Sequence, residues 1–291
     1  MAGFLGTTTS FSIFEAPVPS KLDFEAVRAW AFSDAVTPEG TRLGWVGLGN
    51  AVDTDFSFGI DHGRFAALSL RVDSRKASGA ALKLQLAEAV QEELAQGGNV
   101  SNKRKKELRE AILAKLISKA EWTPALTDCL WDLEKGRLLV AASPKAALPL
   151  LERFKSTFGV DAQPYTPNED LPSFFARLSR ENIFLNVNGR ELSCAGSATL
   201  ATPLHVEGKM AVAVQNNENT IASALDEGLI IRKLAMIADA SLEFSLDTSL
   251  TVSGLKLPKA EKGADADTDF LLKADVCVMV ADLALAIAGV G

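Results

Sequence analysis

The sequence contains only two histidines, His62 and His205, among its 291 residues. No serine stands in a G-x-S-x-G setting, so a serine–histidine–aspartate hydrolase finds little support. There is no G-x-x-x-x-G-K-[ST] phosphate loop, and GWVGLGN at residues 44–50 has its glycines in the wrong order for G-x-G-x-x-G. These absences argue against both familiar kinds of nucleotide site, and we expect no cofactor.

Long apolar runs and a cysteine framework are also missing. The most apolar stretch, VCVMVADLALAIAGVG, is shorter than the roughly 20 residues of a spanning helix and is interrupted by Asp282, so we expect it in the core. MAGFLGTTTSFSIF has no basic region before its apolar residues, which argues against a secretory signal. Three widely spaced cysteines indicate free thiols in a reducing cytoplasm: Cys129, Cys194 and Cys277.

The acidic composition makes one basic stretch unusual. The formal net charge is -7, yet SNKRKKELRE at residues 101–110 has four consecutive basic residues at the start of an expected helix. Polyanion binding by such a chain requires a segregated basic surface. Projected at about 100° per residue, the helix 103–120 places Arg104, Lys115 and Lys119 on one flank, apart from its acidic residues. This is a cationic array roughly 22 Å long, although a solvated helix face is the simpler interpretation.

Strand and helix patterns occur in separate groups, which favours an α+β fold of antiparallel sheets with a projecting two-helix arm. Strands are predicted at 7–16, 55–61, 64–72, 229–238, 241–247 and 250–257, with a hairpin at 126–142. Helices are predicted at 21–32 after Ser20, at 81–96 and 103–120 in the arm, and at 144–158. The expected parts are an N-terminal α+β part at 1–76, the arm at 77–123, a hairpin and helix at 124–165, and a C-terminal α+β part at 166–291.

One acidic cluster has part of a calcium-loop pattern. DADTD at residues 265–269 has the spacing that opens such a loop, but Phe270 replaces the glycine and Val276 stands at the closing glutamate position. We therefore interpret it as the polar start of a strand.

A second acidic cluster flanks the predicted hairpin. Asp53, Asp55 and Asp61, together with His62, would suit a nuclease that uses two metal ions. Hairpin ends are rich in aspartate in any protein, however, so a structural role is the simpler interpretation.

Among the tryptophans, Trp30, Trp45 and Trp131 are interpreted as core anchors. Trp122 differs because it follows the second arm helix, between Glu121 and Thr123, where little core is expected. An exposed aromatic at an arm tip suits self-association as well as local packing.

Several of these pieces, in this order, resemble the recombination-associated protein RdgC family. The similarity spans roughly residues 21–287. The matching features are Gly44-Trp45-Val46, the hairpin leading to Arg71 and Arg75, the arm with KELREAILAKLI, Trp131-Asp132 with Gly136, EGLIIRKLAM at 227–236, and DTDF at 267–270 ahead of DLALAI.

The resemblance implies a U-shaped protomer that pairs into a closed ring homodimer. Such a ring encircles double-stranded DNA without reading its sequence and restrains the RecA recombinase, as a cytoplasmic, nucleoid-associated protein. The family also carries an exonuclease label, but we find no residue set for hydrolysis and expect no catalytic or metal site. The candidate DNA-binding residues are Arg71, Arg75, Arg104, Lys115, Lys119, Arg232 and Lys233.

This chain departs from the family pattern in two places. Where the family tends to place phenylalanines at the arm tip, as a gate contact between protomers, this chain has Glu121-Trp122 and Pro124, which makes Trp122 the candidate dimer contact. The region before 217–226, basic in the family, retains only Lys209 and Gln215. A metal-dependent DNA nuclease and a ring-forming assembly protein without DNA affinity are the alternative functions.

Overall fold

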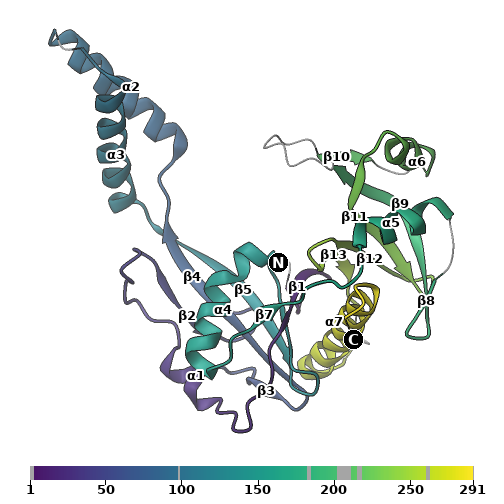
Figure 1. Cartoon of the computed structure of the whole chain (residues 1–291). Coiled ribbons are helices and arrows are strands. Elements are labelled where there is room, and N and C mark those ends of the chain that lie inside the picture. The colour runs from purple at the N-terminus through teal and green to yellow at the C-terminus, as the bar shows by residue number, and fades with distance from the viewer. Residues whose placement is uncertain are drawn as a thin grey trace. The chain divides into compact units, whose positions relative to one another are not determined.

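The chain has a mixed fold with a large, mainly antiparallel sheet, so the predicted α+β class is confirmed (Figure 1). It divides into two compact units. Unit 1 comprises residues 1–31, 45–70 and 127–291, and unit 2 comprises residues 32–44 and 71–126. The computed structural model describes residues 3–97, 99–181, 185–201, 211–214, 218–259 and 263–290.

The sheet follows the order β10-β9-β11-β12-β13-β1-β6-β5-β4-β2, and β3, β7 and β8 pair with β4, β1 and β9. The bounds are β1 (Thr8–Glu15), β2 (Arg42–Val46), β3 (Asp61–His62), β4 (Phe65–Arg75), β5 (Trp122–Asp132), β6 (Arg137–Val140), β7 (Gln163–Pro164), β8 (Leu185–Val187), β9 (Arg190–Ala201), β10 (Ala211–Val214), β11 (Ile230–Ala238), β12 (Leu242–Asp247) and β13 (Thr251–Lys256). In its register, β1 places Phe11 opposite Val252 of β13 and Ile13 opposite Leu139 of β6. The predicted meander of β11, β12 and β13 is confirmed.

Helices cover both faces of the sheet in unit 1: α4 packs against Trp131, and α7 belongs to the cluster of the adjacent Leu130. Their bounds are α1 (Glu25–Ala29), α4 (Pro144–Phe158), α5 (Leu171–Glu181), α6 (Glu218–Asp226) and α7 (Ala266–Ile287) in unit 1, and α2 (Gly79–Ala95) and α3 (Asn102–Lys119) in unit 2. α5 and α6 lie against β9 and β11 (Figure 1). The apolar stretch predicted to be core forms most of α7, whose side chains are buried along almost its whole length.

Local signals predicted α4 and the hairpin before it correctly. Ser143 stands at the N-cap of α4, Pro144 opens the helix, and Gly159 ends it in the left-handed conformation at φ 70°. β5 and β6 pair as a hairpin around Gly136, as predicted. In both cases, residues with strong backbone preferences stand where the chain turns. They are Pro144 and Gly159 at the ends of α4, and Gly136 in the hairpin.

Two predicted elements of the N-terminal part are wrong. The helix expected at 21–32 covers only Glu25–Ala29, because Trp45 donates its backbone N–H to the carbonyl of Trp30 and draws the chain into the sheet. The strand expected at 55–61 is mostly turn, since Phe56 and Gly59 both adopt positive φ. The hydrogen bond between Trp45 and Trp30 thus shortens the predicted helix, and left-handed turns replace the predicted strand.

The acidic stretch at 265–269 begins a helix, so its interpretation as the start of a strand is wrong. Asp265 is the N-cap of α7 and accepts a hydrogen bond from the backbone N–H of Thr268 at 2.7 Å. That bond lowers the pKa of Asp265. Asp267 and Asp269 lie in the first turn, where the helix dipole favours negative charge.

Asp282, which interrupts the apolar stretch, ties α7 to the β5–β6 hairpin. Its carboxylate accepts hydrogen bonds from Lys135 Nζ, at 2.5 Å, and from Arg137 Nη1. The one charge in the apolar C-terminal half of α7 is therefore paired with two cations of one hairpin, which satisfies its oxygens.

A buried carboxylate lies between β4 and β5. Asp128 accepts hydrogen bonds from the Ser69 hydroxyl, at 2.6 Å, and from the backbone N–H of Phe4. Burial raises the pKa of Asp128, and the two hydrogen bonds offset this only in part. The three cysteines are free, and burial raises the pKa of the Cys129 and Cys277 thiols well above the usual range.

Replacing Asp128 with asparagine is expected to raise the unfolding midpoint at pH 7 by a few degrees. A carboxyl whose pKa is raised by folding binds its proton more tightly in the folded state, so its contribution to stability falls as pH rises through that pKa. Asparagine cannot ionise and avoids this loss. The advantage of Asp128→Asn should therefore shrink as pH falls toward about 4, near the ordinary pKa of aspartate.

Thermal unfolding of both proteins between pH 4 and 7.5 measures this difference. Asp161→Asn is the control, because the Asp161 carboxylate is exposed and pairs only with the exposed Lys155. An advantage of Asp128→Asn that does not change with pH would contradict the expectation.

Candidate nucleic-acid interface

Charge is divided unequally between the two units. Unit 2 carries twelve lysines and arginines against nine acidic residues, a formal net charge of +3. Unit 1 carries 18 against 28, a net charge of −10. α3 alone has seven basic and two acidic residues. The basic surface that an acidic chain needs for binding a polyanion is thus concentrated in unit 2.

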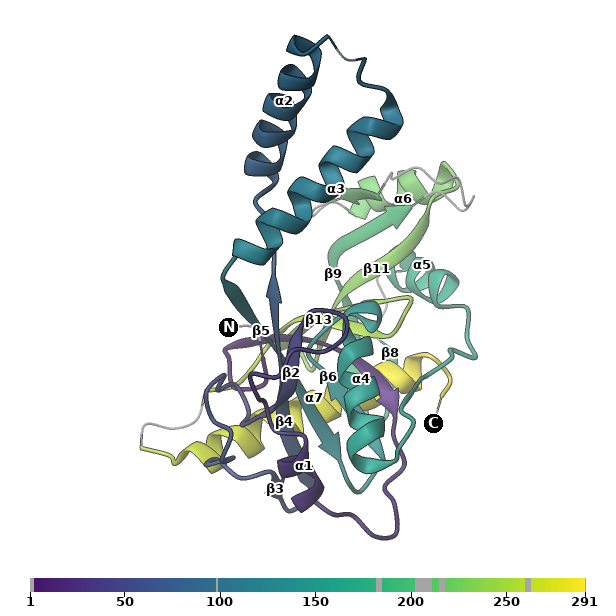
Figure 2. The same cartoon turned by 90° about the vertical axis from the view of Figure 1, so that its left-hand side faces the viewer.

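The two arm helices form the predicted helical hairpin (Figure 2). Ser78 caps α2, and Ser101 caps α3 by accepting a hydrogen bond from the backbone N–H of Arg104 at 3.2 Å. Neither helix contains a buried residue. On α3, Leu108, Ile112, Leu113 and Leu116 are half-buried, while the cations of this helix are exposed.

Four lysines of α3 are available to solvent. They are exposed, and none forms an ion pair within the part of the chain that the structure describes: Lys103, Lys105, Lys115 and Lys119. A fifth, Lys106, lies 3.9 Å from the carboxylate of Glu110. The cations predicted at 115 and 119 are thus exposed on one helix, and their contact with DNA stays a prediction.

Arg104 lies between two carboxylates. Its guanidinium donates to Glu93 of α2 at 2.8 and 2.6 Å and to Glu107 at 3.2 Å. The hydrogen bond to Glu93, followed by that to Glu107, raises the pKa of Arg104. The separation of signs expected on this helix is therefore incomplete, and Arg104 holds α2 against α3.

Arg71 is also engaged by an acidic neighbour. Its Nε and Nη2 donate to the two carboxylate oxygens of Asp73 at 2.8 and 2.7 Å, and its guanidinium lies 3.9 Å from the ring centroid of Phe32. The hydrogen bond to the buried Asp73 raises the pKa of Arg71. This geometry is that of a structural ion pair at the end of β4.

Trp122 is not at the arm tip, so the premise of its assignment as a tip contact is wrong. The tip is the connection between α2 and α3, whereas Trp122 is the first residue of β5. The guanidinium groups of Arg42 and Arg75 each lie 4.3 Å from its ring centroid. The sequence could not indicate this cluster, because its members come from three separate segments.

Arg232 and Lys233 occupy an irregular point of β11. Ile231 pairs with Leu200 of β9 and Lys233 with the adjacent Thr199, so Arg232 is an extra residue in the ladder. A bulge changes the direction of side chains, and here two consecutive residues are half-buried between two buried ones. The predicted pair is thus accessible, although strict alternation would bury one member.

The aspartates near the predicted hairpin accept hydrogen bonds within backbone turns. Asp53 accepts hydrogen bonds from the backbone N–H and hydroxyl of Ser57, and Asp61 accepts one from the N–H of Gly63. His62 Nδ1 lies 2.7 Å from the carboxylate of Asp267. Within the described residues, no group of three or more histidine, cysteine or acidic side chains is placed to hold a metal ion.

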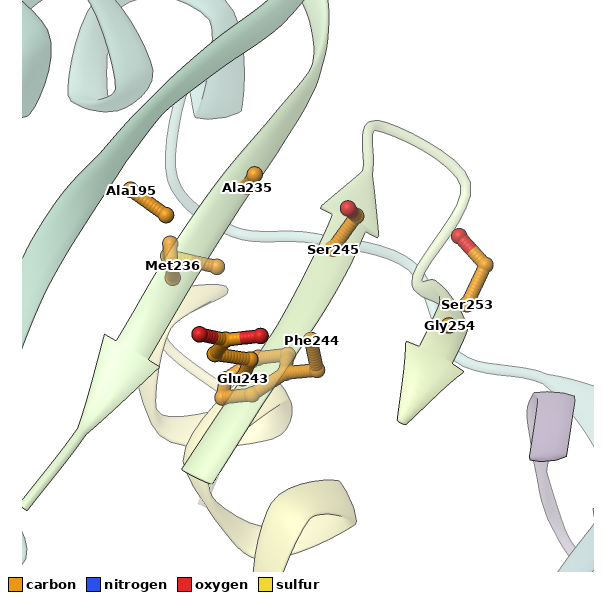
Figure 3. Close-up of a pocket in the computed structure, with 8 residues that line it drawn as sticks. All are labelled: Ala195, Ala235, Met236, Glu243, Phe244, Ser245, Ser253 and Gly254. Atoms are coloured by element: carbon orange, nitrogen blue, oxygen red, sulfur yellow. The ribbon is translucent and has the colours of Figure 1, made fainter. Parts of the chain in front are cut away.

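A small pocket of about 160 Å³ lies over β11, β12 and β13 (Figure 3). Ala235, Ser245 and Ser253 line it, together with Glu243, whose carboxylate is held by Lys256 at 2.6 Å. Ligand pockets usually measure about 300–1,000 Å³. This pocket is therefore small for an organic ligand, and its one charged lining residue is acidic.

The three tryptophans interpreted as core anchors differ in burial. Trp45 and Trp131 are buried as expected, whereas Trp30 is 40% exposed, so its interpretation as a core anchor is wrong. Lys209, Gln215 and His205 lie outside the described residues. In the described ranges, no helix combines the length and apolar character needed to cross a bilayer.

A family model described as "Putative exonuclease, RdgC" matches residues 12–290. No curated protein matches the chain. The matched range includes both units and every candidate residue of the interface.

Proposed function

Because the chain belongs to the RdgC family, which confirms the family predicted from its motifs, we propose that it binds double-stranded DNA without sequence preference. In this proposal it acts as a ring-shaped homodimer that limits recombination by RecA, in association with the nucleoid. The DNA-binding part of the proposal is carried by one observation: in a unit of net positive charge, four exposed lysines of α3 form no ion pair with any residue that the structure describes.

Lysines on a helix surface bind phosphates as point charges and carry no sequence information. Lys105 and Lys119 share one side of α3 at about 100° per residue and are 14 residues apart, so the array extends over roughly 21 Å at 1.5 Å per residue. A duplex presents one negative charge per about 1.7 Å of its axis. The array is therefore long enough to face several phosphates, which supports binding to the DNA backbone.

Self-association is supported by the unburied apolar side of the arm. α2 and α3 are 17 and 18 residues long, yet neither has a buried residue. Leu84 and Leu94 of α2 and Ile117 of α3 are exposed. Helices of this kind gain stability when a second apolar surface covers them, and a second copy of the chain provides one.

A gel-shift titration on duplex DNA tests the function. We expect retardation of two 30-base-pair duplexes of unrelated sequence with equal affinity, and an affinity that falls steeply as salt rises from 50 to 200 mM. Light scattering of the free protein should give the mass of a dimer. Absence of retardation at 50 mM salt, or a strong preference for one duplex, would contradict the proposal.

The same titration in the presence of magnesium addresses the exonuclease in the family description. Shortened DNA that depends on magnesium would indicate hydrolysis. The matched control is Asp55→Asn. Asp55 is exposed and belongs to the acidic cluster with Asp53 and Asp61, which would suit a metal-dependent nuclease.

A further inference from the structure

Three segments of unit 2 meet at Trp122. Arg42 comes from β2, Arg75 ends β4 and Trp122 begins β5. Each guanidinium carbon lies 4.3 Å from the ring centroid, so the two cations are at most twice that distance apart. Arg42 Nη1 donates to Asp34 at 2.6 Å, whereas Arg75 Nη1 reaches only the backbone carbonyl of Ser118, at 3.3 Å.

The hydrogen-bonding capacity of these two arginines is not used up. Within the described residues the Nε atoms of both are buried and have no hydrogen-bond partner. Arg75 has no ion pair there either, and Asp34 offsets only one of the two charges. Arg71, by contrast, has its guanidinium fork occupied by Asp73. Two close cations with one carboxylate form a site with excess positive charge.

We propose that Arg42 and Arg75, held in place by Trp122, form a binding site for phosphodiester groups of the DNA backbone. The proposal rests on the proposed function and adds to it a defined contact. The indole attracts each guanidinium through its ring face and so holds both cations near one ring. Planar guanidinium groups bind phosphate oxygens through paired N–H donors.

The site favours a duplex over a single strand. Proteins that bind single strands stack bases on aromatic side chains. Two guanidinium groups already lie against the ring of Trp122, which leaves less of it to stack with a base. Acidic peptides offer carboxylates of similar geometry, and binding to polyglutamate is therefore measured alongside DNA.

The test measures the salt dependence of duplex binding by full-length variants. Arg42→Gln with Arg75→Gln should lower the slope of log affinity against log salt by about 1.8, because each phosphate contact contributes about 0.9. At 0.1 M salt the affinity should fall about fifty-fold. The control pair Lys145→Gln with Lys259→Gln removes the same charge from exposed positions of unit 1 and should leave the slope unchanged.

Variants of Trp122 separate positioning from charge. Trp122→Leu keeps both cations and should lower the affinity about ten-fold, whereas Trp122→Phe, which retains a ring face, should bind within about two-fold of wild type. Thermal unfolding shows whether each variant folds. If Trp122→Phe binds as weakly as Trp122→Leu, the positioning role is overturned.

The outcomes distinguish the two proposals. If the wild-type protein does not bind duplex DNA, both are overturned. If it binds and the double glutamine variant has an unchanged slope, only the arginine site is overturned. If polyglutamate binds as tightly as the duplex and loses affinity equally in the double variant, the assignment to phosphodiesters is overturned. A slope lowered by about 1.8 for DNA alone supports it.

Discussion

Replacing four lysines of α3 with glutamine is expected to lower the affinity for duplex DNA by roughly three and a half orders of magnitude at 0.1 M salt. Each phosphate contact adds about 0.9 to the salt slope, which corresponds to roughly eight-fold in affinity at that concentration. Glutamine is a good helix former, so α3 should persist, and far-UV circular dichroism checks this. The four residues are Lys103, Lys105, Lys115 and Lys119.

The control replaces four exposed lysines of unit 1 with glutamine, which removes an equal amount of charge. They are Lys21, Lys145, Lys155 and Lys259. Both variants have a net charge four lower than wild type, so a difference between them reports where the charge lies. Affinities measured by fluorescence anisotropy from 50 to 300 mM salt give the slope for each. Equal losses in the two variants would show that only total charge matters, which contradicts a localised interface.

Replacing Trp131 with alanine is expected to cost about 4 kcal/mol of unfolding free energy. Trp131 is 1% exposed and packs against Phe154 and Phe158, with ring centroids 4.8 and 5.3 Å away. Its indole N–H donates to the carbonyl of Ala16 at 2.8 Å. Alanine leaves both a cavity and an unpaired buried carbonyl, and each lowers stability.

Urea unfolding measures this loss, with Trp122→Ala as the matched variant. Trp122 is half-buried, and its contacts are two arginines at an accessible site, so its removal should cost about 1 kcal/mol or less. A cost below about 2 kcal/mol for Trp131→Ala would contradict its role as an anchor of the core.

Sequence reasoning succeeded where residues act locally. The start of α4 follows from Ser143 and Pro144, and Ser101 or Asn102 indicates the start of α3, where the structure has Ser101 as the cap. Apolar content alone indicated that the residues of α7 lie in the core. It failed for α1, because the contact between Trp30 and Trp45 that ends this helix joins segments separated by a loop.

The interface was harder to predict because charge compensation depends on distant partners. Glu93, which binds Arg104, is eleven residues away across the helical hairpin. Arg42 was not among the predicted residues, although it shares Trp122 with the predicted Arg75. One local signal was available for Arg71: Asp73 is two residues away on the same strand, and alternation places both side chains on one face.

The pairing of β1 determines when unit 1 is able to fold during synthesis. Ser12 of β1 lies opposite Val140 of β6 and Thr251 of β13, and α7, which completes the core, follows β13. At about 5–20 residues per second, the ribosome needs on the order of ten to fifty seconds to reach β13 after making β1. Throughout that time Phe11, which is buried in the finished fold and lies opposite Val252 of β13, lacks its final neighbours. Both helices of the α2–α3 hairpin precede β5, so the ribosome completes the arm long before it makes α7, which completes the core of unit 1.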